Sequence, residues 1–182
     1  MSEPLYRRLL GARFDVLPAC VRALHDVGAA STWRGRASVR RGRTGVSRLV
    51  ARLASLPPDG ADQELLVTFR ARASREIWSR RFGSHHYFCS IQYARRGMLN
   101  ERVGPSTLLF TPITCAHGLA LRLDGFRLLG IPLPGLLHPK IQTLEREHAG
   151  RYHFEVEATL PAFGLLVAYA GWLEPVGETA AQ

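Results

Sequence analysis

Hydrophobic and polar residues alternate one for one through most of the chain after residue 63. In residues 64–72, for example, Leu65, Val67 and Phe69 fall on one side of an extended chain and Thr68 falls on the other. Side chains of a β-strand point alternately to its two faces, so this pattern is typical of strands with one buried face. Turn residues recur roughly every 8 to 15 residues, which is typical of antiparallel all-β folds.

The alternation predicts ten strands, one of them before residue 64. They are residues 32–43, 64–72, 76–82, 86–94, 98–103, 107–114, 119–129, 140–148, 152–160 and 165–173. So many antiparallel strands in a small domain protect their edges by closing into a barrel or folding into a sandwich. The consecutive hairpins favour a mainly β fold, an antiparallel up-and-down β-barrel of about eight to ten strands.

The first 56 residues show helical periodicity on both sides of their single strand. Pro18 suits a first helical position, residues 19–25 continue the helix, and Gly28 ends it. We therefore expect two or three N-terminal helices packed at one end of the barrel.

A later helix follows Thr44, a suitable N-cap residue. Its apolar residues recur at helical spacing and are Val46, Leu49, Val50 and Leu53. Arg48 and Arg52 lie on the opposite side, and two prolines after Leu56 end the helix. We expect this basic amphipathic helix to pack over the core, and the alternative is a helix that lies on a membrane surface.

Residues 128–137 (LLGIPLPGLL) are apolar and interrupted by proline. Proline removes a backbone hydrogen-bond donor, so this segment is not expected to form regular sheet. It is either a loop packed over the mouth of the barrel or an exposed contact patch.

Length and composition agree with one globular domain. A chain of 182 residues with 46% hydrophobic residues is expected to form one core over residues 1–174, followed by a loose tail at 175–182. No apolar run approaches the roughly 20 residues that a membrane-spanning helix needs, and the N-terminus does not resemble a secretory signal. Three widely spaced cysteines, Cys20, Cys89 and Cys115, indicate reduced thiols in a cytoplasmic protein.

The net charge of +9 raises the question of nucleic-acid binding. Of the 24 basic residues only Lys140 is not arginine, and most arginines stand singly at alternate positions, as on the solvent face of strands. No aromatic RNA-binding motif, helix-turn-helix spacing or zinc-finger spacing is present. We therefore expect no specific nucleic-acid partner.

Several motifs resemble those of a known family. They are Leu5-Tyr6-x-Arg8-Leu9-Leu10-Gly11, Phe14-Asp15-x-Leu17-Pro18, Val21-Arg22-x-Leu24-His25, Gly35-x-Ala37-x-Val39, Leu56-Pro57-Pro58, Trp78-x-Arg80-x-Phe82-Gly83, Glu101-Arg102-x-Gly104-Pro105, Arg127-Leu128-Leu129-Gly130-x-Pro132-Leu133-Pro134 and Tyr169-x-Gly171-Trp172-Leu173. Together they resemble the bacterial family Domain of Unknown Function 4166 over nearly the whole chain. The resemblance implies no particular reaction, because that family has no established activity or assigned catalytic residues. Its members occur alone or fused to other domains, and this chain resembles the free-standing kind.

Known cofactor and metal motifs are missing from the sequence. No phosphate-binding GxxxxGK[ST] loop and no GxSxG nucleophile motif occurs. The residues Glu145, Glu147, His148 and His153 cluster in sequence, but we interpret them as a solvated hairpin end. We therefore expect no cofactor and no metal site.

Two charged residues share strand faces with bulky apolar neighbours. Alternation places Glu101 on the face of Leu99 and Val103, and Arg80 on the face of Trp78 and Phe82. Burying either charge is costly unless the two are paired. One strand separates them, a backbone distance of roughly 9 to 10 Å that an arginine side chain spans. The pair is either a structural ion pair or a polar site inside an apolar cavity.

Further candidates complete the predicted site. The expected walls of the cavity are Trp78, Phe69, Phe88, Phe110, Leu121, Tyr152, Phe154 and Tyr169. His25, near the end of a helix, is a third catalytic candidate if it reaches the barrel mouth as a general base, and its alternative role is to cap helix carbonyls.

Two classes of function fit this interpretation. The first is a cofactor-independent cyclase or isomerase that acts on a hydrophobic, polyketide-like natural product, by architectural analogy with small barrels that cyclise polyketides. The second is a non-catalytic carrier of a lipid or metabolite, or a protein-interaction module that uses residues 128–137. A filled barrel and a homodimer both remain open from the sequence.

Overall fold

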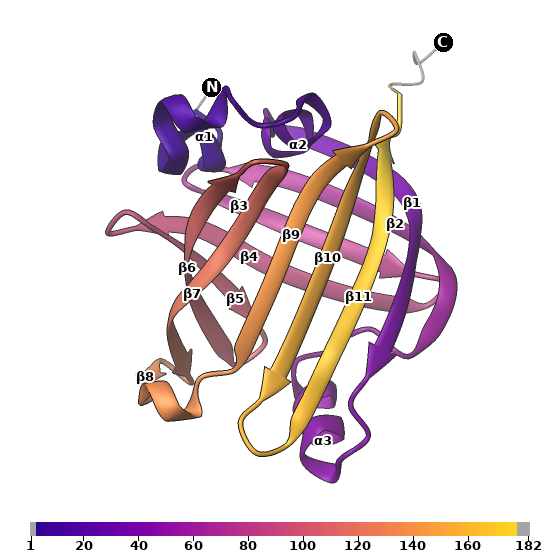
Figure 1. The fold of residues 1–182 in the computed structure, drawn as a ribbon, viewed down its shortest axis with the longest axis vertical. Coiled ribbons are helices and arrows are strands. Elements are labelled where there is room, and N and C mark those ends of the chain that lie inside the picture. The colour runs from indigo at the N-terminus through magenta and orange to yellow at the C-terminus, as the bar shows by residue number, and fades with distance from the viewer. Residues whose placement is uncertain (1–2, 178–182) are drawn as a thin grey trace.

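Ten strands close into an antiparallel barrel in the computed structural model, which describes residues 3–177 (Figure 1). The ring contains β1 (Ala30–Arg41), β2 (Gly60–Arg72), β3 (Arg75–Phe82), β4 (His86–Arg95), β5 (Met98–Val103), β6 (Ser106–Cys115), β7 (Gly118–Leu128), β9 (Lys140–His148), β10 (Arg151–Leu160) and β11 (Gly164–Pro175). Neighbours in the ring are neighbours along the chain, apart from a short β8 between β7 and β9, and β11 pairs with β1 to close it. The prediction of an up-and-down barrel is confirmed.

The predicted strands match the observed ones closely. β5 and β9 have the predicted bounds, and the largest difference is at β2, which begins at Gly60 because it pairs with Val39 near the end of β1. β11 extends to Pro175 at the start of the predicted tail, and residues 178–182 of that tail lie outside the described residues. None of the described helices is long and apolar enough to cross a bilayer.

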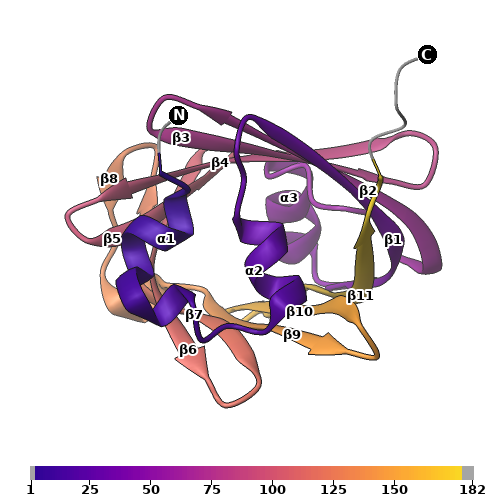
Figure 2. The same cartoon turned by 90° about the horizontal axis from the view of Figure 1, so that it is seen from above.

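The N-terminal helices cover one end of the barrel, as predicted (Figure 2). They are α1 (Leu5–Leu10), the 3-10 helix η1 (Gly11–Phe14) and α2 (Ala19–His25). Several of their apolar side chains, among them Tyr6, Phe14 and Leu24, are fully buried in the same core as the inner faces of the strands.

The helix α3 (Gly45–Leu53) packs differently from the prediction. It lies at the opposite end of the barrel from α1 and α2 (Figure 1), and the residues that it buries are Ser47 and Ala51. The Ser47 hydroxyl donates a hydrogen bond of 2.9 Å to the Leu165 carbonyl of β11, which turns the small residues of the helix inward. Three of the four apolar residues expected to cover the core, Val46, Leu49 and Leu53, are therefore exposed.

The proline-interrupted segment is an exposed connection between β7 and β9. Ile131 and Pro132 form the two-residue strand β8 against the end of β7, so the expectation of no sheet is wrong at these two residues. The rest is irregular apart from the 3-10 helix η2 (Gly135–Leu137), which has no buried residue. Of the two predicted arrangements, the structure has the exposed one.

The pairing between β7 and β9 is the shortest in the ring. It comprises two residue pairs, Gly118 with Arg146 and Leu119 with Glu145. Beyond them the Leu121 backbone N–H donates instead to the Thr143 hydroxyl, at 2.7 Å. A side chain thus takes the place of the next backbone hydrogen bond between these strands, and backbone pairing around the ring is sparsest here.

Two glycines allow β1 and β11 to approach closely where the ring closes. A Cβ atom on Gly171 would lie 2.1 Å from the Arg36 carbonyl oxygen, and one on Gly35 would lie 1.9 Å from that of Trp172. Because backbone cannot move aside as a flexible side chain can, we predict that Gly171→Ala lowers the free energy of unfolding by about 1–3 kcal/mol. Thermal melts should then show a fall of about 2–10 °C for a chain of this length.

Gly45→Ala is the matched control, because no atom lies within 4 Å of the added methyl group. Its melting temperature should be unchanged or slightly higher, since alanine favours helix. Equal melting temperatures for Gly171→Ala and the wild-type protein would show that the close approach carries no constraint.

Candidate functional site

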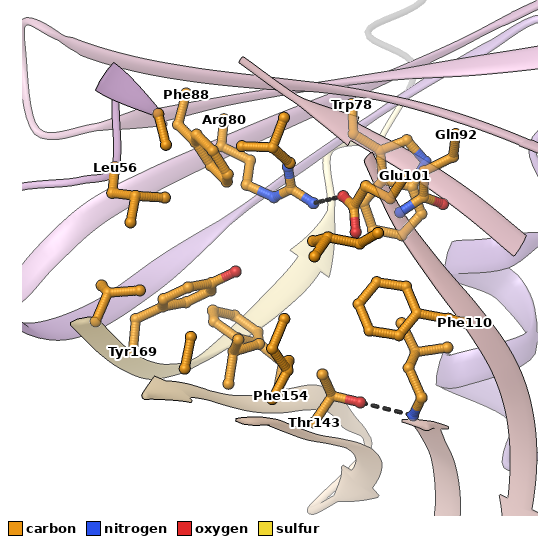
Figure 3. Close-up of a pocket in the computed structure, with 18 of the residues that line it drawn as sticks. Leu56, Trp78, Arg80, Phe88, Gln92, Glu101, Phe110, Thr143, Phe154 and Tyr169 are labelled. Carbon is orange, nitrogen blue, oxygen red and sulfur yellow. Dashed lines mark hydrogen bonds and ion pairs between the residues drawn. The ribbon is translucent and has the colours of Figure 1, made fainter. Parts of the chain in front are cut away.

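A cavity of about 190 Å³ lies inside the barrel. Every side chain predicted as its wall lines it, namely Trp78, Phe69, Phe88, Phe110, Leu121, Tyr152, Phe154 and Tyr169. They come from strands on all sides of the ring, because each strand turns alternate residues inward (Figure 3). The eight residues thus surround one cavity, and their role in binding a ligand stays a prediction.

Arg80 and Glu101 meet inside this cavity (Figure 3). Arg80 lies on β3 and Glu101 on β5, separated by β4 as the alternation predicted. The guanidinium Nη2 is 3.8 Å from the Glu101 Oε1 atom, and the two side chains are 11% and 13% exposed. The two opposite charges therefore face one another among apolar side chains.

The pair is loose, and Arg80 has further support. A separation of 3.8 Å is longer than a hydrogen bond. The guanidinium also donates to the Ser90 hydroxyl at 3.1 Å, and its carbon lies 5.1 Å from the ring centres of Trp78 and of Phe88. These contacts hold Arg80 in place and leave donors on Arg80 and acceptor positions on Glu101 for a polar group of a ligand.

A second polar cluster lies at the end of the cavity under α2. The His25 ring contacts Glu145 of β9 through an Nε2–Oε2 distance of 2.5 Å, and the Tyr6 ring packs on His25 with centroids 3.8 Å apart. Glu145 lines the cavity, whereas His25 is fully buried behind it. His25 therefore does not reach the barrel mouth as a catalytic residue would, and its contact with the cavity runs through Glu145.

The interpretation of Glu145 as part of a solvated hairpin end is wrong. Glu147 and His148 are exposed, but Glu145 is buried on the inner face of β9, where it contacts His25 of α2. The Cys20 N–H of α2 donates to the Glu147 carboxylate of the same strand at 2.9 Å. The sequence alone does not show which hairpin end a helix covers. Among residues 3–177, no three His, Cys, Asp or Glu side chains are grouped so as to hold a metal ion.

Glu76 is a third buried carboxylate. Its oxygens accept hydrogen bonds of 3.1 Å from the Leu5 backbone N–H and from the Trp78 indole N–H, so it joins α1 to the barrel wall. Burial raises the pKa of Glu76 above its ordinary value of 4.5, and the two hydrogen bonds oppose this only in part. Glu76 shares a strand face with Trp78 and Arg80, so the alternation that identified Arg80 also contains the signal for Glu76.

Tyrosines complete the polar part of the lining. Burial raises the pKa of Tyr169 to about 12, with the nearby charge of Arg80 lowering it and those of Glu101 and Glu145 adding to the increase. Burial, together with Glu145, also raises the pKa values of Tyr6 and Tyr152 well above 10. These phenols stay neutral at physiological pH, and Figure 3 shows the Tyr169 hydroxyl directed into the cavity. They offer hydrogen bonds and not negative charge.

Comparison with known families agrees with the resemblance seen in the sequence. The model of a family described as "Domain of unknown function (DUF4166)" matches residues 17–173, nearly the whole chain. The search of curated proteins finds none that matches the chain. The comparisons thus confirm the predicted resemblance and assign no reaction to the site.

The raised pKa of Glu76 predicts how stability changes with pH. A carboxyl with a raised pKa in the folded state binds its proton before the unfolded chain does, so folding gains stability as the pH falls through that pKa. We expect the melting temperature of the wild-type protein, relative to Glu76→Gln, to rise as the pH is lowered from about 7 to about 5. Thermal melts of both proteins across this range measure the difference.

Glu157→Gln serves as the control, because it changes an exposed carboxylate of β10 in the same way. The difference in melting temperature between the wild-type protein and Glu157→Gln should not change over the same pH range. A flat difference for Glu76→Gln as well would mean that burial does not perturb this carboxyl.

Proposed function

Since the chain belongs to the DUF4166 family, whose description names no activity, we propose a function from the site itself. The barrel binds a small hydrophobic carbonyl compound and acts on it as a cofactor-independent isomerase or cyclase. The observation that carries this proposal is the loose Arg80–Glu101 pair inside an otherwise largely apolar cavity.

The size and the lining of the cavity support the class of substrate. A volume of about 190 Å³ somewhat exceeds the roughly 150 Å³ of an engineered apolar cavity that binds benzene. Aromatic and aliphatic walls favour a hydrophobic carbon skeleton, and a few convergent polar groups select one oriented oxygen. A ring compound with a carbonyl, of the kind found among polyketide-like natural products, fits both requirements.

The chemistry follows from the two charges. Arg80 donates hydrogen bonds to the carbonyl oxygen, and Glu101 removes a proton from the carbon next to that carbonyl. The electron pair of the broken C–H bond forms an enolate, whose negative oxygen the guanidinium stabilises. Where the substrate has a C=C bond next to that carbon, Glu101 returns the proton to the far carbon of this bond, so the double bond moves into conjugation with the carbonyl and the carboxylate is restored. In a longer substrate the enolate carbon instead attacks a second carbonyl and closes a ring, and Glu101 gives its proton to the alkoxide oxygen that this attack forms.

The second candidate is a carrier that binds the same class of compound without changing it. The predominantly apolar lining favours this candidate, because most of the cavity offers only shape and hydrophobic contact. In a carrier Arg80 and Glu101 hold the polar end of the ligand and no proton moves.

One substitution separates the two candidates. We predict that the wild-type protein isomerises 3-cyclohexen-1-one to its conjugated isomer, and that Glu101→Gln lowers this rate by about 10²–10⁴-fold because the base is lost. Ultraviolet absorbance of the conjugated product measures the rate, and ligand-observed NMR measures binding. Glu157→Gln, which alters an exposed carboxylate, should keep the full rate.

Stability is the companion measurement for Glu101→Gln. Because Ser90 and two aromatic rings still hold Arg80, we expect Glu101→Gln to lower the free energy of unfolding by about 1 kcal/mol or less. A loss of about 3–5 kcal/mol with unchanged rate in the folded protein would identify a structural ion pair. Binding of the ketone without catalysed isomerisation would favour the carrier. The absence of both binding and turnover would contradict both candidates.

A further inference from the structure

Apolar side chains are exposed on three separate segments at the end of the barrel opposite α1 and α2 (Figure 1). These segments are α3, the β10–β11 turn and the connection between β7 and β9, and we call their exposed surface the α3 end. The most exposed apolar side chains there are Leu49, Leu53, Leu129, Ile131, Leu136 and Leu137, and Phe163 of the β10–β11 turn is exposed as well. Single exposed leucines are ordinary, but such a group marks a surface that binds something.

The three segments of the α3 end carry positive charge only, and the first acidic residue after α3, Asp59, accepts a hydrogen bond of 2.7 Å from the Arg41 backbone N–H. Residues 43–58, 127–140 and 160–166 contain no Asp or Glu, and their cations are Arg43, Arg48, Arg52, Arg127 and Lys140. None of these five forms an ion pair with another residue of the described range 3–177. The charge is therefore free to attract an anionic partner.

The orientation of α3 is the strongest indication that this end of the barrel is a binding surface. Ser47 and Ala51 face the barrel, whereas Leu49 and Leu53 are 59% and 61% exposed. Burial of the leucines in the protein core would have been more favourable by about 1.5–3 kcal/mol for each side chain. Because the helix buries Ser47 and Ala51, Arg48 and Arg52 are exposed together with the leucines and not on a face opposite to the exposed one. An exposed helix surface of leucines and arginines is typical of helices that lie in the interface of a membrane.

We propose that the α3 end docks onto the surface of an anionic lipid bilayer. The leucines enter the boundary between headgroups and acyl chains, and the five cations lie near the lipid phosphates. Nucleic acid would use the cations but not the leucines. A symmetric dimer through this surface would bring the five cations of one copy against those of the other, which is unfavourable.

The cavity reaches the same end of the barrel. Val50 of α3, Phe126 at the end of β7 and Pro139 before β9 all line it. A hydrophobic compound dissolved in the bilayer would therefore enter the barrel next to the docked surface. This consequence rests on the proposed function, whereas docking itself does not.

Vesicle binding without added ligand tests the proposal, and its outcome is independent of any reaction at Glu101. The full chain should co-sediment with vesicles of phosphatidylcholine and phosphatidylglycerol in equal parts, and less with phosphatidylcholine alone. Combining Arg48→Gln with Arg52→Gln should lower partitioning to the anionic vesicles about 25-fold, since each basic residue near such a surface contributes about 1 kcal/mol. Leu53→Ser should lower it on the order of tenfold.

Matched controls lie elsewhere on the surface. Val16→Ser changes a residue that is exposed at the opposite end, and Arg95→Gln with Arg96→Gln removes two exposed charges at the β4–β5 turn. Both control proteins should bind vesicles like the wild type. An equal loss of vesicle binding in the two control proteins would overturn the proposal, and so would the absence of vesicle binding by the wild-type protein. A dimer in analytical ultracentrifugation that Leu53→Ser abolishes would overturn it too, because a second copy would then cover this surface.

Discussion

Closure of ten antiparallel strands into one ring is the constraint on which the rest of this molecule depends. The ring gives each of its strands a neighbour on both sides, although β7 and β9 share only two residue pairs, and it depends on close contact between β1 and β11 at Gly35 and Gly171. An eight-stranded barrel is just wide enough for side chains to fill, and ten strands enclose more space. The inward residues and the N-terminal helices therefore form one core, and the remaining space is a cavity that extends to the α3 end.

The helices at the two ends of the barrel pack against it in different ways. At one end α1, η1 and α2 insert fully buried side chains such as Tyr6 and Phe14, and Glu76 and Glu145 join α1 and α2 to the strands through hydrogen bonds. At the other end α3 covers the barrel with small residues, and its leucines remain outside. The first end is built for stability, and the second has the features of a binding surface.

The interior concentrates charge where burial makes it costly. Three carboxylates, those of Glu76, Glu101 and Glu145, are largely buried inside the barrel, and each has a different partner. Glu76 and Glu145 form short contacts with the N-terminal helices, whereas among the described residues Glu101 has only the longer contact with Arg80. A carboxylate with incomplete local partners that also lines the cavity is the group best suited to interact with a ligand. The same comparison explains why His25, bound to Glu145 and closed off from the cavity, is the weaker catalytic candidate.

The sequence by itself determined the strands, their inward faces and the wall of the cavity, because a period of two assigns each side chain to a face before any contact is known. It also brought Arg80 and Glu101 together, since consecutive hairpins make sequence neighbours into sheet neighbours. Only the tertiary structure decided which way α3 turns and which hairpin end α2 covers. The helical pattern of α3 contains an apolar stripe but not the hydrogen bond from Ser47 to Leu165, and the strand pattern around Glu145 does not include the helix above it. Such contacts join residues more than 100 positions apart, and local periodicity carries no information about them.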